Sequence, residues 1–387
     1  MRILTVGHSY VVAMNRRLPQ EWALAGHDVT VAAPAFYHAD LRAMACETGA
    51  DEAFDLQPIP AQFTKRVHLF RYGRALKRLI DTRRFDVVHA WAEPYVYSGY
   101  QVARWTPRSS SLIYSTFQNL PKKYPPPFSW MERHAMTRAA GWTAFGRTIA
   151  ENLSTRHIYA NRPWTEIPLG VDLNAFRPRP ELREQAAREI GWAADGPPVI
   201  GFVGRFVPEK GIELLLETLE RLDGPGDRWR VAFIGGGPME DRLRRWSRLR
   251  GDHAARVVTG VSHDRVPALL NGIDIGVVPS RTTPKWKEQL GRILIEFMAT
   301  GVPVVASDSG EIPHVVQNAG IIRGEGDVIA WAGALNRLID DAVFRKSYTE
   351  AGLEHVRRRY DWRHVAERFA RFFETVMDRR RIRNTTL

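Results

Sequence analysis

Two glutamates that lie eight residues apart have the chemistry to hold a nucleotide. Glu288 and Glu296 stand at the two ends of the segment EQLGRILIE, with Gly291 between them. We expect a helix to begin at Gly291, whose first backbone N–H groups then have no acceptor within the helix and favour a phosphate. The carboxylate of Glu296, inside this helix, suits hydrogen bonds from ribose hydroxyls. The alternative is that both glutamates are solvated helix carboxylates.

Two cations follow a predicted strand near the middle of the chain. In the segment GFVGRFVPEKG (201–211), Gly204 and Arg205 end an apolar run, and Lys210 comes five residues after Arg205. Two positive charges on one loop at a strand end suit a diphosphate whose negative charge grows as it departs as a leaving group. The alternative interpretation is an exposed basic turn without a ligand.

Glycine-rich loops follow other apolar runs in the same half. They are GGG at 235–237 and GVS at 260–262, and the segment GVPVVASDSGE at 301–311 follows the predicted helix. Glycine lets backbone approach a ligand closely, so the first two loops are places where a nucleotide could be held.

Short apolar runs alternate with amphipathic stretches along the chain, which is typical of βαβ units and a parallel sheet. A helix is predicted over Tyr72–Thr82, where Leu76, Leu79 and Ile80 recur at helical spacing. In the first half, the predicted strands are Arg2–Val6, Val29–Ala32, Asp86–Ala90, Leu112–Ser115 and Trp142–Phe145. In the second half, they are Val199–Val203, Val231–Ile234, Val257–Val258, Ile275–Val278 and Val304–Ala306. Ligands of open α/β sheets lie beyond the carboxyl ends of the strands, which is where the loops described above are expected.

The chain is long enough for two domains. Its 387 residues exceed one ordinary core, and a proline-rich stretch from Ile167 to Pro180 is the candidate linker. We predict two Rossmann-like, doubly wound α/β domains. The N-terminal domain is 1–168, completed by 362–387, and the C-terminal domain is 169–361, with a last helix over Trp362–Asp378.

Taken in order, these segments resemble glycosyltransferase family 4, a retaining family with the GT-B fold. The similarity runs from GRFVPEKG through Pro279-Ser280 and EQLGRILIE to GVPVVASDSGE, and it reaches back to Ile167–Phe176. The resemblance implies two domains that face each other across a cleft, with the C-terminal helix crossing back to the N-terminal domain. It also implies a hexosyltransferase that takes a UDP- or GDP-sugar as donor substrate and needs no bound cofactor.

The resemblance also implies a role for individual residues. Arg205 and Lys210 match the pair that grips the donor diphosphate in place of a metal ion, and Glu288 matches the glutamate near the transferred sugar. Glu296 matches the residue that holds the ribose. The remaining residues of the implied donor site are Gly204, Leu290 and Gly291, the base-flanking Val261 and Ser262, and Gly7 and His8 after the first strand. No metal site is expected, since the histidines show no H-x3-H spacing.

The first half departs from the family pattern on the acceptor side. A histidine that contacts the sugar often follows the strand that corresponds to Asp86–Ala90, and here the sequence is VVHAWAEP (87–94). His89 is a catalytic candidate, but Trp91 or Glu93 could fill the position, and His89 could equally be a core histidine. A second family histidine is absent, with TFQN (116–119) in its place.

These observations predict a retaining transferase that moves a sugar to a saccharide or lipid-linked acceptor, in cell-envelope or exopolysaccharide synthesis. One alternative is a GT-B enzyme that processes sugar nucleotides without an acceptor, such as an epimerase. Another is a nucleic-acid-binding protein, prompted by a net charge of +12. No helix-turn-helix, zinc spacing or RNA-binding aromatic pattern supports nucleic acid as a partner.

The basic charge has a second interpretation. Basic residues interleave with aromatic ones around 65–84 and 122–130, a composition that suits docking on an anionic membrane. The sequence has a single cysteine, Cys46, and neither a signal peptide nor a long apolar segment is evident. We therefore expect a cytoplasmic protein, peripheral on the inner face of the membrane.

Overall fold

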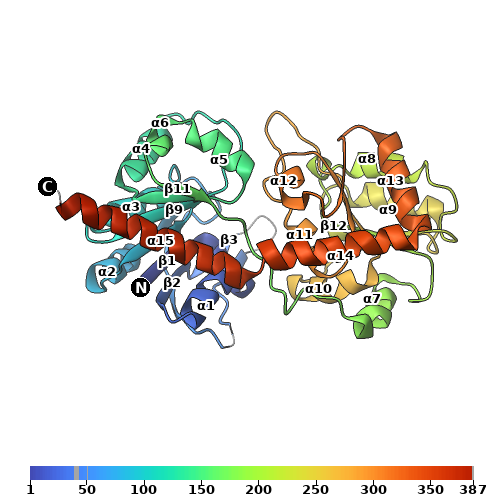
Figure 1. Cartoon of the computed structure of the whole chain (residues 1–387), viewed down its shortest axis with the longest axis horizontal. Helices are drawn as coiled ribbons and strands as arrows, with labels where there is room; N and C mark the ends of the chain where they lie inside the picture. The colour runs from blue at the N-terminus through green and yellow to red at the C-terminus, as the bar shows by residue number, and fades with distance from the viewer. Residues whose placement is uncertain (39–42, 50, 386–387) are drawn as a thin grey trace. The chain divides into compact units, whose positions relative to one another are not determined.

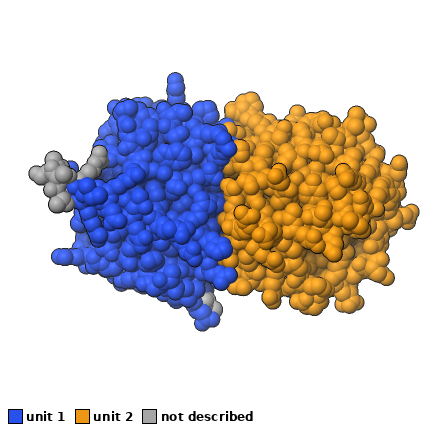
Figure 2. All heavy atoms as spheres, in the orientation of Figure 1, with its two compact units in different colours: residues 1–170, 362–387 blue, residues 171–361 orange. Residues whose placement is uncertain are grey.

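The computed structural model describes residues 1–38, 43–49 and 51–385. They form two compact units, unit 1 (1–170 and 362–387) and unit 2 (171–361), which are coloured separately in Figure 2. The predicted boundary between residues 168 and 169 lies two residues from this division, and the predicted return of the chain at 362 coincides with it.

Unit 1 is built on a seven-stranded, entirely parallel sheet in the order β11-β10-β9-β8-β1-β2-β5. Its strands are β1 (Arg2–Gly7), β2 (Asp28–Pro34), β5 (Asp55–Ile59), β8 (Val87–Trp91), β9 (Ser111–Thr116), β10 (Gly141–Ala144) and β11 (Trp164–Glu166). The helices are α1 (Arg17–Leu24), α2 (Arg74–Thr82), α3 (Tyr97–Trp105), α4 (Phe128–Arg138), α5 (Arg147–Ser154), α6 (His157–Ala160) and α15 (Trp362–Thr385). Two small antiparallel pairs complete the unit, β3 (Phe36–His38) with β4 (Ala43–Ala45) and β6 (Ala61–Gln62) with β7 (Arg71–Tyr72).

Unit 2 repeats the architecture with a six-stranded parallel sheet in the order β14-β13-β12-β15-β16-β17. Its strands are β12 (Val199–Arg205), β13 (Arg230–Gly236), β14 (Ala255–Val258), β15 (Ile275–Val278), β16 (Val304–Ser307) and β17 (Ile321–Arg323). Its helices are α7 (Arg183–Ile190), α8 (Ile212–Leu219), α9 (Glu240–Arg250), α10 (Val266–Leu269), α11 (Arg292–Ala299), α12 (Ile312–Val316), α13 (Val328–Asp340) and α14 (Ala342–Arg359).

The last helix belongs to the first unit. Although α15 follows α14 directly in the chain, it lies across unit 1 beside α1 (Figure 1). Trp22 of α1 is fully buried, donates its indole N–H to the carbonyl of Ala366 at 3.1 Å, and packs edge-on against Phe369. The aromatic face of α15 therefore completes the core of unit 1.

The predicted fold class is confirmed at the level of its elements. All ten predicted strands are present, and the helix predicted over 72–82 begins two residues later, at Arg74. The sequence did not indicate β5, β11 and β17, each of which lies at the edge of a sheet.

Candidate functional site

Most of the residues predicted to bind a nucleotide follow strands of unit 2. Because every strand of this sheet is parallel, the ends of β12, β14 and β15 and the loops after them lie at one edge, here named the carboxyl edge of unit 2. Arg205 is the last residue of β12, Ser280 comes two residues after β15, and Glu288 leads into α11. Ligands of such sheets bind at this edge.

Lys210 and Glu288 form a buried ion pair at the carboxyl edge of unit 2. The ammonium Nζ of Lys210 lies 2.5 Å from Oε2 of Glu288, and the Ser280 hydroxyl donates to the same oxygen at 2.8 Å. The backbone N–H of Gly291 donates to Oε1 at 3.3 Å. Glu288 is only 6% exposed, so it is a fixed group and not a solvated helix carboxylate.

An aromatic ring adds to this arrangement. The Lys210 ammonium also lies 5.1 Å from the centroid of the Trp286 ring, a cation–π contact. The carboxylate and the ring thus hold the cation in one place, the Ser280 hydroxyl holds the carboxylate, and about a fifth of the Lys210 side chain stays exposed. Sequence reasoning gave Ser280 and Trp286 no role, because their contacts depend on how the loops meet in space.

Gly211 allows the loop after β12 to approach the end of β15 closely. Gly211 follows the 3-10 turn Pro208–Lys210 with φ +70°, and a Cβ there would lie 1.7 Å from the carbonyl oxygen of Pro279. The loop after β12 therefore packs directly on the end of β15. The N–H of Arg281 donates to the carbonyl of Glu209 at 2.8 Å and joins the same two segments.

Gly291 lies at the start of α11, as the sequence predicts. It adopts φ +67° and caps the helix that runs from Arg292 to Ala299. The first N–H groups of a helix have no acceptor in the preceding turn, and the helix dipole favours negative charge at this end. Leu290, immediately before it, is buried and anchors the loop.

Glu296 sits inside α11 and is mostly shielded from solvent. Its carboxylate lies 3.0 Å from the guanidinium Nε of Arg292, one turn earlier, and its side chain is 13% exposed. Burial raises the pKa of Glu296 to about 7, and the charge and hydrogen bond of Arg292 oppose that rise. This carboxyl group therefore changes charge near neutral pH.

The other predicted residues of unit 2 also follow strands. Gly204, in β12, has open space where a side chain would be, and so does Gly260, two residues after β14. After Gly260, Val261 is half-buried and Ser262 is exposed. The carboxyl edge of unit 2 thus carries backbone that a ligand can approach closely.

In unit 1, Gly7 ends β1 and His8 begins the following 3-10 turn. The ring of His8 lies against Tyr37, with centroids 5.1 Å apart. Burial lowers the pKa of His8 to about 4, so the imidazole is neutral at neutral pH. Gly7 and His8 lie at the carboxyl edge of unit 1, the edge where the strands of that sheet end.

His89, the catalytic candidate of the first half, lies in the core of unit 1. Its side chain is fully buried, and its two ring nitrogens share hydrogen bonds with the hydroxyls of Thr5 at 2.9 Å and Ser115 at 2.7 Å. Burial lowers its pKa to about 3. With both nitrogens occupied inside the sheet, His89 has the environment of a structural histidine, and we leave it out of the proposed site.

Of the two other candidates for that position, only Glu93 brings a charged group to the carboxyl edge of unit 1. Trp91 is 8% exposed and packs against Phe145, with ring centroids 4.7 Å apart. Glu93, after β8, accepts hydrogen bonds from the Thr116 hydroxyl at 2.7 Å and the Phe117 N–H at 2.6 Å. Burial raises the pKa of Glu93 to about 7 against these two hydrogen bonds.

Gln118 is a further polar residue at this edge that sequence reasoning did not single out. It follows β9 and is 5% exposed, and neither its amide oxygen nor its amide nitrogen has a hydrogen-bond partner among the described residues. A buried amide without a partner is costly, which points to a ligand group or water that satisfies it. It belongs to the segment TFQN (116–119), which stands in place of the second family histidine.

The described residues contain neither a metal-binding cluster nor a helix that could span a membrane. No three His, Cys, Asp or Glu side chains there lie close enough to hold a metal ion. No helix in the same part of the chain has the length and apolar character needed to span a bilayer.

Comparison with known families assigns both halves of the chain. The profile described as "Glycosyltransferase Family 4" matches residues 10–175, and that described as "Glycosyl transferases group 1" matches residues 184–355. This chain belongs to glycosyltransferase family 4.

Individual relatives agree with the family profile. The enzyme is 29% identical to phosphatidyl-myo-inositol mannosyltransferase of Mycolicibacterium smegmatis over 91% of its own length and 86% of the relative. It is 26% identical to 2-deoxystreptamine glucosyltransferase of Streptomyces kanamyceticus, over 70% and 69% of the two chains. The solved structure of HepE from Anabaena with UDP-glucose superposes with a TM-score of 0.71 at 17% identity, covering 96% and 99%.

The fold of this glycosyltransferase is therefore GT-B, and its reaction is sugar transfer from a nucleotide-sugar. The predicted family, fold and enzyme class are confirmed, and sugar transfer stands over the two alternative functions.

Proposed function

We propose that unit 2 binds a UDP- or GDP-sugar and that unit 1 binds the acceptor, with retention of the anomeric configuration. The observation that carries the donor assignment is the fixed Lys210–Glu288 pair beside the start of α11. A fixed, partly exposed cation next to the start of a helix suits a diphosphate, and Arg205 at the end of β12 adds a second cation on the same edge.

Each donor-site residue then has a task. Arg205, Lys210 and the backbone around Leu290 and Gly291 stabilise the diphosphate as it departs. Glu288 holds Lys210 in place and lies near the transferred sugar. Glu296 accepts hydrogen bonds from the ribose hydroxyls, while Gly204, Val261 and Ser262 line the nucleoside. Gly7 and His8, at the carboxyl edge of unit 1, keep the part in donor binding that the family resemblance implies.

The proposed reaction balances without a protein base. The bond between the anomeric carbon and the diphosphate oxygen breaks, and the acceptor oxygen bonds to that carbon from the same face. The acceptor proton passes to a phosphate oxygen of the leaving nucleoside diphosphate. His89 is buried with both ring nitrogens hydrogen-bonded, so it is not available as a base, and the phosphate oxygen takes that part.

The acceptor is proposed to be a saccharide or a lipid-linked sugar, held near Glu93 and Gln118. Docking on an anionic membrane is supported by an exposed segment of unit 1 in which Phe63 (55% exposed), Val67 and Leu69 surround Lys65 and Arg66. Apolar side chains beside cations suit the headgroup region of an anionic bilayer. The proposed location is the cytoplasmic face of the cell membrane.

A thermal-shift and turnover screen against UDP- and GDP-sugars, without added metal, tests the donor assignment. We expect one base to stabilise the enzyme by several degrees. Glu296→Ala should chiefly weaken donor binding, and Lys210→Ala should chiefly lower kcat. Wild-type constants in both variants would refute this site, and the anomeric configuration of the product, read by NMR, tests retention.

A further inference from the structure

Unit 1 contains a cavity at the end of its sheet opposite to the proposed acceptor site. It has a volume of about 1060 Å³ and lies where the chain enters β9, β10 and β11, under the end of α15. Because the sheet is parallel, this is the opposite edge from Gly7 and Glu93. None of the residues assigned above to donor or acceptor lines it.

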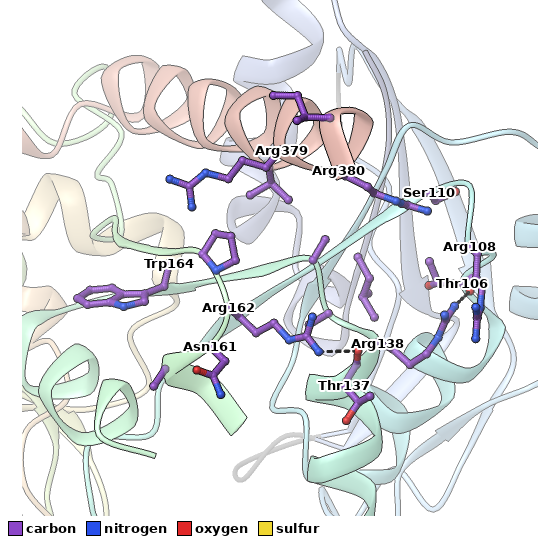
Figure 3. Close-up of a pocket in the computed structure, with 17 residues that line it drawn as sticks. Thr106, Arg108, Ser110, Thr137, Arg138, Asn161, Arg162, Trp164, Arg379 and Arg380 are labelled. Carbon is purple, nitrogen blue, oxygen red and sulfur yellow. Dashed lines mark hydrogen bonds between the residues drawn. The ribbon is translucent and has the colours of Figure 1, made fainter. Parts of the chain in front are cut away.

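The lining of this cavity is strongly basic. Five of its residues are arginines, and none of the described residues that line it is an aspartate or glutamate: the arginines are Arg108, Arg138, Arg162, Arg379 and Arg380. Figure 3 shows Arg379 and Arg380 extending from α15 on one side, with Arg138 and Arg162 on the other. Elsewhere in unit 1 arginines meet carboxylates, as in Arg16 with Glu52 and Arg156 with Glu132.

Backbone carbonyls position two of these guanidinium groups. Arg138 donates to the carbonyl of Thr106 at 2.7 Å, and Arg162 donates to that of Thr137 at 2.9 Å (Figure 3). A guanidinium carries five N–H donors, so Arg138 retains others for a ligand. Its side chain is held in place while its positive charge remains available.

Arg380 is electrostatically disfavoured in this cavity. Burial lowers the pKa of its guanidinium, and the charge of Arg138 lowers it further. Two cations held at a half-buried site repel each other, and an anion between them would remove that repulsion.

We propose that this cavity is a binding site for a ligand that carries two or more phosphate groups. Arginine forks match phosphate oxygens in pairs, and arginines on opposite walls suit several phosphates better than one. The volume is that of a cavity for an organic ligand, well beyond a single phosphate ion.

An aromatic wall fits the organic part of such a ligand. Trp164, at the start of β11, lines the cavity with 42% of its surface exposed. Its ring stacks on Trp142, with centroids 5.3 Å apart and planes at 20°. The tryptophan is thus rigid and can contact a sugar or other ring attached to the phosphates.

Calorimetric titration of the full-length enzyme with tripolyphosphate tests this site. We expect salt-dependent binding that Arg380→Gln weakens about tenfold, the loss typical of one charge-assisted contact. Arg371→Gln is the matched control, since it removes a charge from the exposed side of the same helix, where Arg371 faces Glu367. The Arg205→Gln variant separates this site from the donor site, because it should retain the binding that Arg380→Gln loses.

Stability of the ligand-free variants provides a second readout. Arg380→Gln should leave the Tm unchanged or raise it, because it relieves repulsion with Arg138. A fall in Tm of several degrees would indicate a structural arginine and overturn the proposal. Sugar transfer from a soluble donor to a soluble acceptor should be the same in Arg380→Gln as in wild type.

Vesicles distinguish the source of the phosphates. Binding of tripolyphosphate but not of cardiolipin vesicles through Arg380 supports a soluble ligand, and Arg380-dependent binding of the vesicles supports a lipid headgroup. Equal binding of both probes by wild type and Arg380→Gln, or no binding of either, would overturn the proposal.

Discussion

At the scale of single residues, the ion pair between Lys210 and Glu288 is the feature on which the donor site depends. Replacing either partner alone removes the opposite charge from a group that is largely shielded from solvent, which is costly. We expect Glu288→Gln and Lys210→Met each to lower kcat/KM by about 100-fold or more, with the double variant losing much less than the product of the two. Steady-state kinetics of the four proteins measures this coupling.

An exposed ion pair provides the control for this comparison of single and double variants. Arg147 and Glu151 pair at 2.9 Å with both side chains 62% exposed, so their replacement should change neither kcat nor KM. Fully additive losses at Lys210 and Glu288 would contradict a shared role.

The raised pKa of Glu93 leads us to expect that the stability of the folded protein depends on pH. Its pKa in the folded protein, about 7, lies above its ordinary value of 4.5. The carboxyl group therefore favours the folded state fully below about pH 4.5, and this contribution is lost as the pH rises through about 7. Glu93→Gln keeps a neutral side chain of the same shape. Relative to wild type, we expect it to gain stability between pH 5 and pH 8, on the order of 1–3 kcal/mol.

Urea unfolding of wild type and Glu93→Gln at pH 5, 6.5 and 8 measures this difference. Asp81→Asn is the control, because Asp81 is half exposed on α2 and pairs with Lys77, one turn earlier. A constant difference between wild type and Glu93→Gln at all three pH values would contradict the raised pKa.

The sequence could predict the types of the site residues but not all of their contacts. The order of Arg205, Lys210, Glu288 and Glu296 indicated a donor site, and in the structure the first three lie in loops or strand ends at the carboxyl edge of unit 2, while Glu296 lies inside α11. Sequence spacing could not decide whether His89 is catalytic, because the answer depends on Thr5 and Ser115, which come from two other strands. Gln118 was missed for the same reason, since its lack of a partner is a property of the packed protein.

At the scale of elements, the central strands were predictable, whereas three of the four edge strands of the two main sheets were not. A strand between two neighbours is buried on both faces and reads as a continuous apolar run, as in β8 and β9. The edge strands β5, β11 and β17 include exposed or half-buried residues, and β5 contains Pro58, which lacks an N–H to donate. Their apolar pattern is therefore too short to stand out.

The loop after β12 gives a prediction at this scale. Gly211 requires φ +70°, and a methyl group there would strike the Pro279 carbonyl. We expect Gly211→Ala to lower stability by about 1–3 kcal/mol, because the backbone must move, and to reduce kcat because Lys210 precedes it directly. Thermal unfolding and kinetics measure both effects.

Gly333→Ala is the matched control for this substitution. Gly333 lies on the exposed side of α13 with nothing within 4 Å of a Cβ. Alanine favours a helix by about 1 kcal/mol over glycine, so this variant should be more stable than wild type with unchanged kinetics. Equal effects of the two substitutions would mean that the Gly211 contact does not matter.

At the scale of the whole molecule, the chain leaves unit 1 at 170 and returns to it at 362. The returning helix supplies Phe369, Phe373 and Val376 to the core of unit 1, and Trp22 packs on two of them. The core of unit 1 is therefore incomplete until the chain end has been made, whereas unit 2 is continuous in sequence. Folding of unit 1 therefore requires a helix that follows unit 2 in the sequence.

Two truncations separate the structural part of α15 from its proposed ligand-binding part. A chain that ends at Asp361 should lose protection of unit 1 against trypsin while unit 2 stays protected, because the buried aromatic face of α15 is gone. A chain that ends at Asp378 keeps Phe369, Phe373 and Val376 but lacks Arg379 and Arg380. It should remain protected throughout and bind tripolyphosphate at least tenfold more weakly. Cleavage of unit 1 in both chains would show that the basic end of α15 is needed for folding. Arg379 and Arg380 would then be structural residues, which would contradict their assignment to a ligand site.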